Sequence, residues 1–236
     1  MREILSIPTD AKGLFAERPN RFLGMVKIPG NGEPVPVHVH DPGRLREILY
    51  PGNRVLLRRA ESPKRKTRWD LIAGLCEGHW VLVHSGLHRA IAEKILTDPE
   101  FSPLGSVDSL QAEVRYNDSR LDFVVQVNGE RVWIETKGCT LCRNGVALFP
   151  DAPTSRGRRH LEHLGEIREN GERAAVMVLV FRPDANRFAP NKETDPAFAG
   201  TFWQVVKRGV EVYPLLLEFR PPGLFCKGLI PLREER

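Results

Sequence analysis

The chain has 236 residues, a formal net charge of +5 at pH 7 and a pI near 9.2. Four cysteines are too few for a disulfide scaffold, whereas 41% hydrophobic residues are enough for the cores of one large domain or two small ones. Because nothing resembles a signal peptide or a membrane-spanning apolar run, we expect a cytoplasmic protein with no membrane partner, and the basic balance favours a polyanionic partner without proving one.

The first third of the chain has the pattern of short β-strands separated by turns rich in Pro, Gly and Asn. Five short strands predict a small barrel, and the oligonucleotide-binding (OB) fold is the natural candidate, although pattern alone does not separate it from other small barrels. The expected strands are 21–27, 35–40, 54–60, 69–75 and 79–83, with one helical turn at 44–50.

Two clusters in this region could contact phosphate groups. In the first, a basic loop precedes an aromatic residue, as in single-strand binders that combine charge attraction with base stacking. In the second, Arg44 follows a turn that leads into a helical start, beside free backbone N–H groups. A solvated charge run and a plain capping turn are the ordinary alternatives. The basic loop consists of Lys64, Arg65, Lys66 and Arg68, followed by Trp69.

After Val83 the apolar residues no longer alternate at every second position but follow the spacing of a helix. This predicts a helix capped by Ser85 and ending near Pro99. We therefore expect two domains, 1–83 and 84–236. Glu93 lies on this helix one turn after Arg89, where a surface ion pair is the ordinary interpretation.

The next stretch predicts two consecutive hairpins. A strand over 110–116 carries Glu113, and a turn at 117–119 leads into a second strand. Segments 121–127 and 131–137 then flank Asn128-Gly129, which strongly favours a two-residue type I′ turn. Counting back from that turn places Asp122 directly opposite Glu135, with Lys137 on the same face of the hairpin.

Two carboxylates placed opposite each other destabilise a hairpin unless a cation lies between them. Mg²⁺ is often held by one or two carboxylates, with water and substrate phosphate completing its shell. Lys137 could then orient a metal-bound water or stabilise charge on a phosphate. An exposed hairpin with solvated Asp, Glu and Lys side chains is the alternative.

Beyond the hairpin, we expect a polar loop at 138–146, a helix at 155–169, a buried strand at 174–181, a helix at 195–208 and a strand at 210–219. The last two strands should be a parallel pair joined by a right-handed crossover, so the sheet is mixed. Arg156, His160 and His163 share one stripe of the first helix, which would carry Arg156 and His160 toward the carboxylates. The tail from Arg220 is expected at the surface.

The polar loop contains Cys139 and Cys142, which form half of a zinc site. No second pair with suitable spacing exists in the sequence, since Cys76 and Cys226 are remote. We therefore expect no redox or metal role for these cysteines.

An Asp followed by a turn and Glu-x-Lys resembles the core signature of the PD-(D/E)xK nuclease superfamily. The surrounding residues resemble the sugar fermentation stimulation protein A family over nearly the whole chain. They are Arg120-Leu-Asp-Phe, Glu135-Thr-Lys, Leu148-Phe-Pro-Asp-Ala-Pro-Thr-Ser-Arg-Gly, His160-Leu and Asp195-Pro-Ala-Phe-Ala. The family motif has Thr-Glu-Arg-Gly where this chain has Thr154-Ser155-Arg156-Gly157, so any role of that missing carboxylate is in doubt.

The resemblance implies an OB-fold followed by a PD-(D/E)xK restriction-endonuclease-like domain with a mixed sheet flanked by helices. It implies Mg²⁺ or Mn²⁺ held by Asp122 and Glu135, a ligand from the carbonyl of Thr136, and Lys137 as the residue that positions water. It also makes Glu93 a candidate metal ligand and strengthens Arg44 as a contact to nucleic acid. Glu113, Arg156 and His160 are expected to support the metal or the phosphate.

Two functions follow from this interpretation. The first is a DNA-binding protein with a metal-dependent deoxyribonuclease site, acting on single- or double-stranded DNA. The second is a non-catalytic DNA-binding regulator of sugar-metabolism genes, so whether the chain is an enzyme stays open. RNA is a weaker third candidate, to be separated by a dependence on the 2′-OH. The sequence is compatible with a homodimer but does not indicate one.

Overall fold

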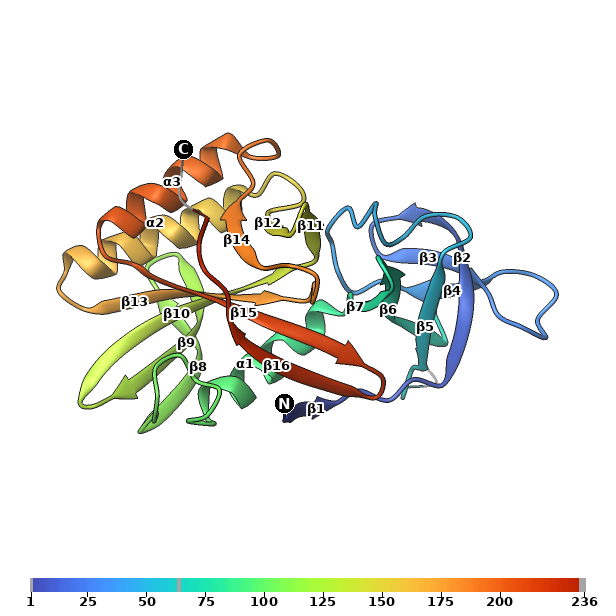
Figure 1. Cartoon of the computed structure of the whole chain (residues 1–236), viewed down its shortest axis with the longest axis horizontal. Helices are drawn as coiled ribbons and strands as arrows, with labels where there is room; N and C mark the ends of the chain where they lie inside the picture. The colour runs from blue at the N-terminus through green and yellow to red at the C-terminus, as the bar shows by residue number, and fades with distance from the viewer. Residues whose placement is uncertain (1, 63–64, 234–236) are drawn as a thin grey trace.

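The computed structural model describes residues 2–62 and 65–233 (Figure 1). Its first part is a closed five-stranded barrel in which β4 also pairs with β6. The expected barrel is therefore confirmed. Its strands, in the order in which they pair, are β4 (Val35–His38), β3 (Leu23–Lys27), β2 (Ala11–Asn20), β5 (Arg54–Arg59) and β6 (Trp69–Cys76).

The expected composition of the barrel was wrong at one strand. β2 belongs to it although no strand was expected at 11–20, because its charged residues and Pro19 obscure an alternation that buries Phe15. β7 (His79–Leu82), expected as the fifth barrel strand, instead pairs with β6 and with β15 (Glu211–Arg220). Consequently one continuous sheet runs from the barrel into the second half of the chain.

The tail beyond Arg220 is also not the surface segment that was expected. It forms β16 (Gly223–Leu229), which pairs with β15 and with β1 (Glu3–Ser6). The side chain of Leu224 is fully buried because it faces the core. β16 and β1 therefore form a branch that leaves the large sheet at β15, whereas β4 and β8 are the ends of its main path.

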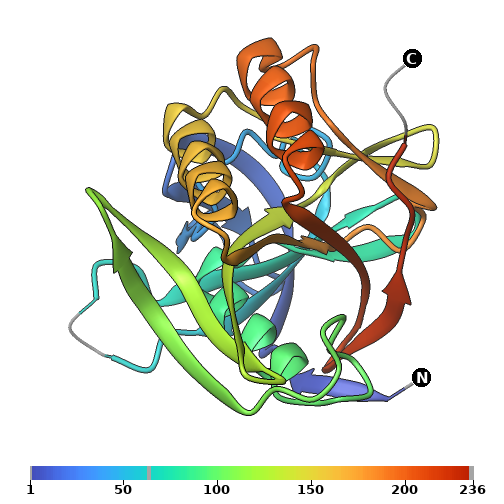
Figure 2. The same ribbon diagram turned by 90° about the vertical axis from the view of Figure 1, so that its left-hand side faces the viewer.

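The second half is a mixed sheet between helices. β8 (Ser109–Tyr116), β9 (Ser119–Val127) and β10 (Glu130–Cys139) are antiparallel neighbours, whereas β10, β13 (Arg173–Val180) and β15 run parallel, as expected. Figure 2 shows α1 on one face of this sheet and two helices on the other. These are α1 (His88–Leu96), α2 (Ser155–Glu169) and α3 (Pro196–Lys207).

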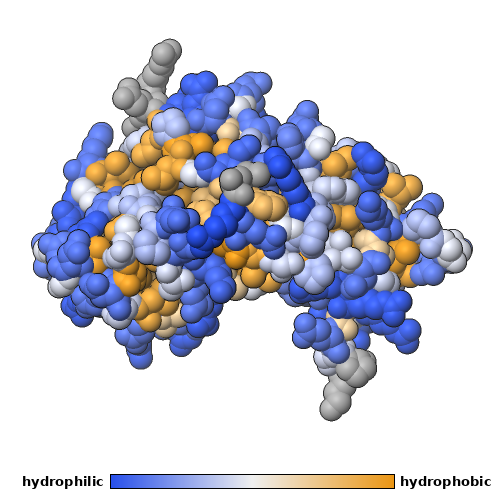
Figure 3. Space-filling view, turned by 60° about the horizontal axis from the view of Figure 1, so that its bottom comes forward, coloured by the Kyte–Doolittle hydropathy of each residue, from blue (hydrophilic) through white to orange (hydrophobic). Residues whose placement is uncertain are grey.

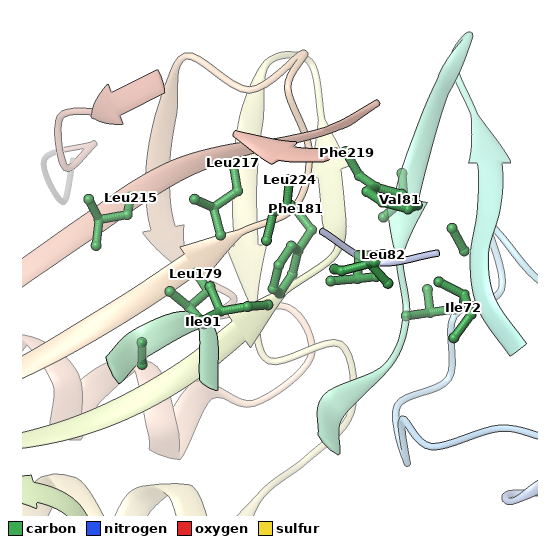
Figure 4. Close-up of a cluster of buried hydrophobic side chains, with 14 of the residues drawn as sticks. Ile72, Val81, Leu82, Ile91, Leu179, Phe181, Leu215, Leu217, Phe219 and Leu224 are labelled. Carbon is green, nitrogen blue, oxygen red and sulfur yellow. The ribbon is translucent and has the colours of Figure 1, made fainter. Parts of the chain in front are cut away.

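Each face of the sheet has its own hydrophobic cluster. The cluster beneath α2 and α3 includes Leu161 and Phe202. The cluster around α1 extends without interruption into the barrel, and Figure 4 shows its side chains converging from both halves of the chain. Those labelled there come from β6 and β7 on one side and from α1, β15 and β16 on the other, with Leu179 and Phe181 between them. The two halves thus share one core.

Two local expectations need correction. A short 3₁₀ helix, η1 (Ser85–Leu87), precedes α1, and the hydroxyl of Ser85 donates to the carbonyl of His40 at 2.6 Å instead of capping α1. The expected polar loop at 138–146 contains strands. A small second sheet consists of β11 (Leu141–Arg143), β12 (Val146–Phe149) and β14 (Arg187–Pro190).

The surface shown in Figure 3 is mostly hydrophilic, with hydrophobic residues in separate patches. None of the helices in the described part of the chain is both long and apolar enough to span a membrane.

The tail strand offers a direct test of this core. Leu224→Ala should lower the free energy of unfolding by about 2 to 5 kcal/mol, because it removes a fully buried side chain and leaves a cavity. Leu229→Ala is the matched control on the same strand: Leu229 is 54% exposed, so its loss should change stability by no more than about 0.5 kcal/mol. Urea denaturation of both variants measures the difference, and equal effects would contradict the packing of β16.

Candidate active site

The hairpin of β9 and β10 has the register that its turn predicts. Asn128 and Gly129 both have positive φ, and the pairs run from Glu130–Val127 to Ile134–Phe123. The next position in this register brings Asp122 to the end of the ladder beside Glu135. There the backbone N–H of Thr136 donates to Oδ2 of Asp122 at 2.7 Å. The local sequence therefore determines which carboxylates meet.

Glu135 is buried and contacts two basic side chains. Its Oε1 accepts from Nζ of Lys137 and from Nδ1 of His160, the latter at 2.5 Å. Its Oε2 is buried and has no hydrogen-bond partner among the described residues. Because buried polar atoms are nearly always partnered, Oε2 marks a position where a cation or a donor would bind.

Helix α2 brings His160 to this position. Thr154 caps the helix, with its hydroxyl oxygen accepting from the N–H of Gly157 at 3.0 Å. His160 lies on the buried face two turns into α2, and its Nε2 accepts from Nε of Arg156 at 3.4 Å. This tautomer leaves Nδ1–H to donate to Glu135, so Arg156, His160 and Glu135 form one chain of contacts.

The two carboxyl groups have different electrostatic surroundings. Burial, and then the charge of Glu135, raise the pKa of Asp122 above its usual value. Burial would also raise the pKa of Glu135, but the charge of Lys137 and the hydrogen bond from His160 outweigh it and lower that pKa. The ionised form of Asp122 is therefore less favoured in the protein alone than in water, and a nearby cation would stabilise it.

These groups face a cavity of about 440 Å³ between the barrel and the mixed sheet. Pro42 contributes a wall from the barrel side, and Thr154 contributes one from the entrance to α2. The sequence-predicted residues that line it are Asp122, Glu135, Thr136, Lys137, Arg156 and His160.

The donor set fits a hard divalent cation such as Mg²⁺ or Mn²⁺. Asp122 and Glu135 supply carboxylate oxygens to one cavity, and the unpartnered Oε2 of Glu135 provides a free ligand atom. Thr136 lines the same wall and could add an oxygen. The cavity has room for water and a phosphate beside the carboxylates, which such sites normally require.

Two predicted supporting carboxylates do not reach this cavity. Glu93 is exposed on α1 and is not among the lining residues, and it does not form the expected pair with Arg89. Glu113 accepts from Arg89 at 3.1 Å and from Arg120 at 2.9 Å, also outside the cavity. Their predicted roles have no geometric support here.

The barrel residues predicted to contact nucleic acid differ in their exposure and in whether their charge is already paired. Arg44 is exposed, and the next residue, Leu45, donates its N–H to Asp151 of the second half at 3.2 Å. Arg65 donates two hydrogen bonds to Asp70, so its charge is already paired. Lys66 and Arg68 are exposed, and Lys64 lies outside the described residues.

His88 and Arg89 also line the cavity, although neither was a candidate from the sequence. His88 is partly buried and stacks on Phe181, with ring centroids 5.2 Å apart. A Cβ on Gly138 would lie 2.1 Å from Cε1 of His88, so the glycine makes room for the ring. A contact between residues fifty positions apart leaves no local sequence signal.

Among the described residues, the free cysteines Cys139 and Cys142 do not belong to a cluster of three or more metal-ligating side chains. Cys139 is buried and its thiol donates to the carbonyl of Leu148 at 3.3 Å. Burial raises the pKa of Cys142 to about 11. Both thiols are therefore protonated near neutral pH, which disfavours metal binding and redox chemistry.

Comparisons with known proteins agree with this architecture. A family model described as the SfsA N-terminal OB domain matches residues 16–83, and one described as the sugar fermentation stimulation protein RE domain matches residues 86–223. A sugar fermentation stimulation protein homolog of Methanococcoides burtonii is 43% identical over 236 residues, covering 98% of this chain and 96% of the relative. One from Thermosipho melanesiensis is 44% identical and covers 98% of each chain.

Among solved structures, that of Pyrococcus furiosus SfsA in complex with Ca²⁺ matches with a TM-score of 0.89 and 25% sequence identity. The match covers 99% of this chain and all of that chain. The fold is therefore an OB barrel followed by a restriction-endonuclease-like domain, as expected from the sequence.

Metal binding can be measured by its effect on stability. With Mg²⁺ at about 100 times its dissociation constant, the wild type should gain about 2.7 kcal/mol of unfolding free energy over the protein in EDTA. Asp122→Asn should lose this gain, whereas Glu113→Gln, outside the cavity, should keep it. Differential scanning calorimetry compares the three proteins.

The stability of Asp122→Asn in EDTA is a control for the metal-binding measurement. The pKa of Asp122 is raised by folding, so its ionised form opposes folding at pH 7. Asp122→Asn in EDTA should thus be at least as stable as the wild type. A variant that is destabilised in EDTA and still responds to Mg²⁺ would contradict the assigned site.

The space for His88 gives a further test. Gly138→Ala should destabilise the protein by about 1 to 3 kcal/mol, because its Cβ overlaps the imidazole ring. Gly200→Ala is the control: Gly200 is exposed within α3 and no atom lies within 4 Å of its Cβ position, so it should gain about 0.4 to 1 kcal/mol. Thermal unfolding of both variants distinguishes crowding at His88 from a general cost of substituting glycine.

Proposed function

Because the chain belongs to the sugar fermentation stimulation protein family, we propose that it is a DNA-binding protein with a divalent-metal-dependent phosphodiesterase site. One observation carries the catalytic part of this proposal. The buried Oε2 of Glu135, which has no hydrogen-bond partner in the part of the chain that the structure describes, shares a cavity with Asp122 and Lys137. Carboxylates beside a lysine are the groups that metal-dependent phosphodiester hydrolysis uses.

In this proposal Asp122 and Glu135 hold Mg²⁺ or Mn²⁺. The ion, when bound, would lower the pKa of a water molecule and stabilise negative charge on the phosphate. Thr136 fixes Asp122 through its backbone N–H, which orients the carboxylate before any ligand arrives. A preoriented carboxylate needs no rearrangement to bind the ion.

Lys137 has a separate task. Its ammonium group contacts Glu135 in the protein alone and lies on the cavity wall. With the ion on Glu135, the ammonium would be directed toward the attacking water or the scissile phosphate, where it would stabilise developing charge. Arg156 would hold a phosphate oxygen from the opposite wall, and His160 would keep Glu135 in place.

We assign DNA binding to the barrel, residues 1–83, and hydrolysis to residues 84–236, although β1 joins the sheet of the second part. The barrel contributes Pro42 to the wall of the cavity. Arg44 is exposed two residues further along that loop. A strand bound along this loop would therefore pass close to the carboxylates. The net charge of +5 favours such binding.

The alternative is a non-catalytic DNA-binding regulator, which the family name suggests. One observation favours it: Lys137 and His160 already compensate the charge of Glu135 without a metal. In that case the cluster would be a structural feature of the domain, and DNA binding by the barrel would be the whole function.

Cleavage of labelled DNA distinguishes the two functions. Single- and double-stranded substrates are incubated with the wild type in Mg²⁺, Mn²⁺ or EDTA, and the products are resolved by electrophoresis. We expect products with metal only. Lys137→Ala should reduce the rate by at least about 100-fold because it removes a group that stabilises the transition state. Lys94→Ala, exposed on α1, is the control and should cleave as the wild type does.

DNA binding is measured in parallel, in Ca²⁺ or EDTA, so that binding and cleavage are separated. Lys137→Ala should bind DNA within a few-fold of the wild type. Unchanged cleavage by Lys137→Ala would remove the proposed mechanism, and DNA binding without products under any metal would establish the regulator. Competition by RNA stronger than by DNA would redirect the proposal to RNA.

A further inference from the structure

A second cluster of metal-binding side chains lies at the junction of the barrel and α1. His40 follows β4, Asp70 lies on β6 and His84 follows β7. Each offers a ligand atom within 4.8 Å of those of the other two. Nε2 of His40 is 2.9 Å from Oδ1 of Asp70, and the rings of His40 and His84 stack with centroids 3.7 Å apart.

His84 is the unusual member of this cluster. The residue is only 5% exposed, and neither ring nitrogen has a hydrogen-bond partner among the described residues. A buried imidazole without partners is less stable than one whose nitrogens are hydrogen-bonded. Two unsatisfied nitrogens in one ring therefore indicate a ligand that the polypeptide itself does not provide.

A glycine beside the cluster keeps side-chain atoms away from the ring of His84. Gly86 has no side chain, and a Cβ there would lie 3.3 Å from Nδ1 of His84 and 3.8 Å from Nδ1 of His40. A side chain at this position would crowd the ring of His84, whereas its distance to His40 is that of an ordinary van der Waals contact. Burial lowers the pKa of His84 to about 4, so the imidazole is neutral at pH 7, which is the form that binds metals.

We propose that His40, Asp70 and His84 form a second metal site, for a borderline transition-metal cation such as Zn²⁺. Two imidazoles and one carboxylate are a common ligand set for zinc, with a fourth position left for water. The 2.9 Å between Nε2 of His40 and Oδ1 of Asp70 is short enough for both to be ligands of one ion. This nitrogen-rich set differs in kind from the all-oxygen pair of Asp122 and Glu135, which suits Mg²⁺.

Arg65 already binds the carboxylate that the metal would need. Its guanidinium donates to both oxygens of Asp70, at 2.6 and 3.0 Å. A cation that binds Oδ1 would repel this positive charge, so the metal and Arg65 compete for one carboxylate. Zinc binding would therefore release Arg65 from its ion pair and leave it available for a phosphate at the barrel surface.

The position of the site gives it a structural consequence. His84 directly precedes η1 and α1, which carry Arg89 to the cavity wall of the candidate active site. A bound ion would join β4 and β6 of the barrel to the segment that leads into the second half. It would thus keep the barrel at a fixed distance from the segment that carries Arg89 to the wall of the candidate active site.

The experiment uses the full chain in an Asp122→Asn background, so that zinc cannot bind the Asp122–Glu135 pair. The protein is stripped with a chelator and titrated with Zn²⁺ against a chromophoric competitor. We expect one equivalent to bind. His84→Asn should weaken binding by more than about 100-fold, since even outer-sphere partners of a metal contribute about 10- to 100-fold.

Two variants separate this proposal from general histidine binding. The ring of His38 meets the ring of His40 edge-on, with centroids 4.3 Å apart, but His38 is outside the ligand set. His38→Asn should therefore bind zinc as the parent does. Arg65→Gln should bind more tightly because it removes the competing cation. Circular dichroism in chelator verifies that each variant is folded.

Several results would overturn the proposal. They are an absence of zinc binding by the folded parent, equal binding by the parent and His84→Asn, an equal loss in His38→Asn and His84→Asn, and weaker binding by Arg65→Gln. Substitution of Co²⁺ gives an independent readout, because its visible spectrum reports coordination directly. A tetrahedral spectrum that disappears in His84→Asn supports the assigned ligands.

Discussion

The candidate site depends on one unfavourable arrangement, the placement of two carboxylates side by side at the end of a hairpin, with Glu135 buried and Asp122 partly buried. Like charges in this position destabilise a folded chain, so the surrounding structure must compensate them. The backbone of Thr136 stabilises Asp122, whereas Lys137 and His160 converge on a single oxygen of Glu135. The other oxygen of Glu135 is left without a partner among the described residues, and a divalent cation there would complete the compensation.

The rest of the fold positions these compensating groups. The parallel pairing of β10 with β13 places α2 over the sheet, and α2 in turn delivers His160. The pairing of β7 with β15 extends the barrel into the same sheet, so the barrel loop at Pro42 forms a wall of the cavity. Because one hydrophobic cluster spans both halves, the barrel and the carboxylates are held in a defined relation. A ligand bound along the barrel loop at Pro42 would therefore lie at the wall of the cavity that contains the carboxylates.

The parts of this arrangement that are local in sequence were predictable. Asn128-Gly129 determines the hairpin register, and helical spacing places His160 on the inner face of α2. The parts that depend on contacts between residues distant in the chain were not predictable. The pairing of β16 with β1 brings together strands from opposite ends of the described chain, and the position of His88 depends on an absent side chain at Gly138. The hairpin of β11 and β12 is a different case: the expected polar loop at 138–146 was wrong, although the sequence carries the local turn signal Asn144-Gly145.

The most direct test of the central claim is to locate the divalent ion. Crystals of the protein with Mn²⁺ and a short DNA oligonucleotide would give an anomalous signal at the metal position. The account predicts a peak bonded to Asp122 and to Oε2 of Glu135, with a DNA phosphate within reach of Lys137. A fully occupied Mn²⁺ elsewhere, or DNA bound with no ion between these carboxylates, would contradict it.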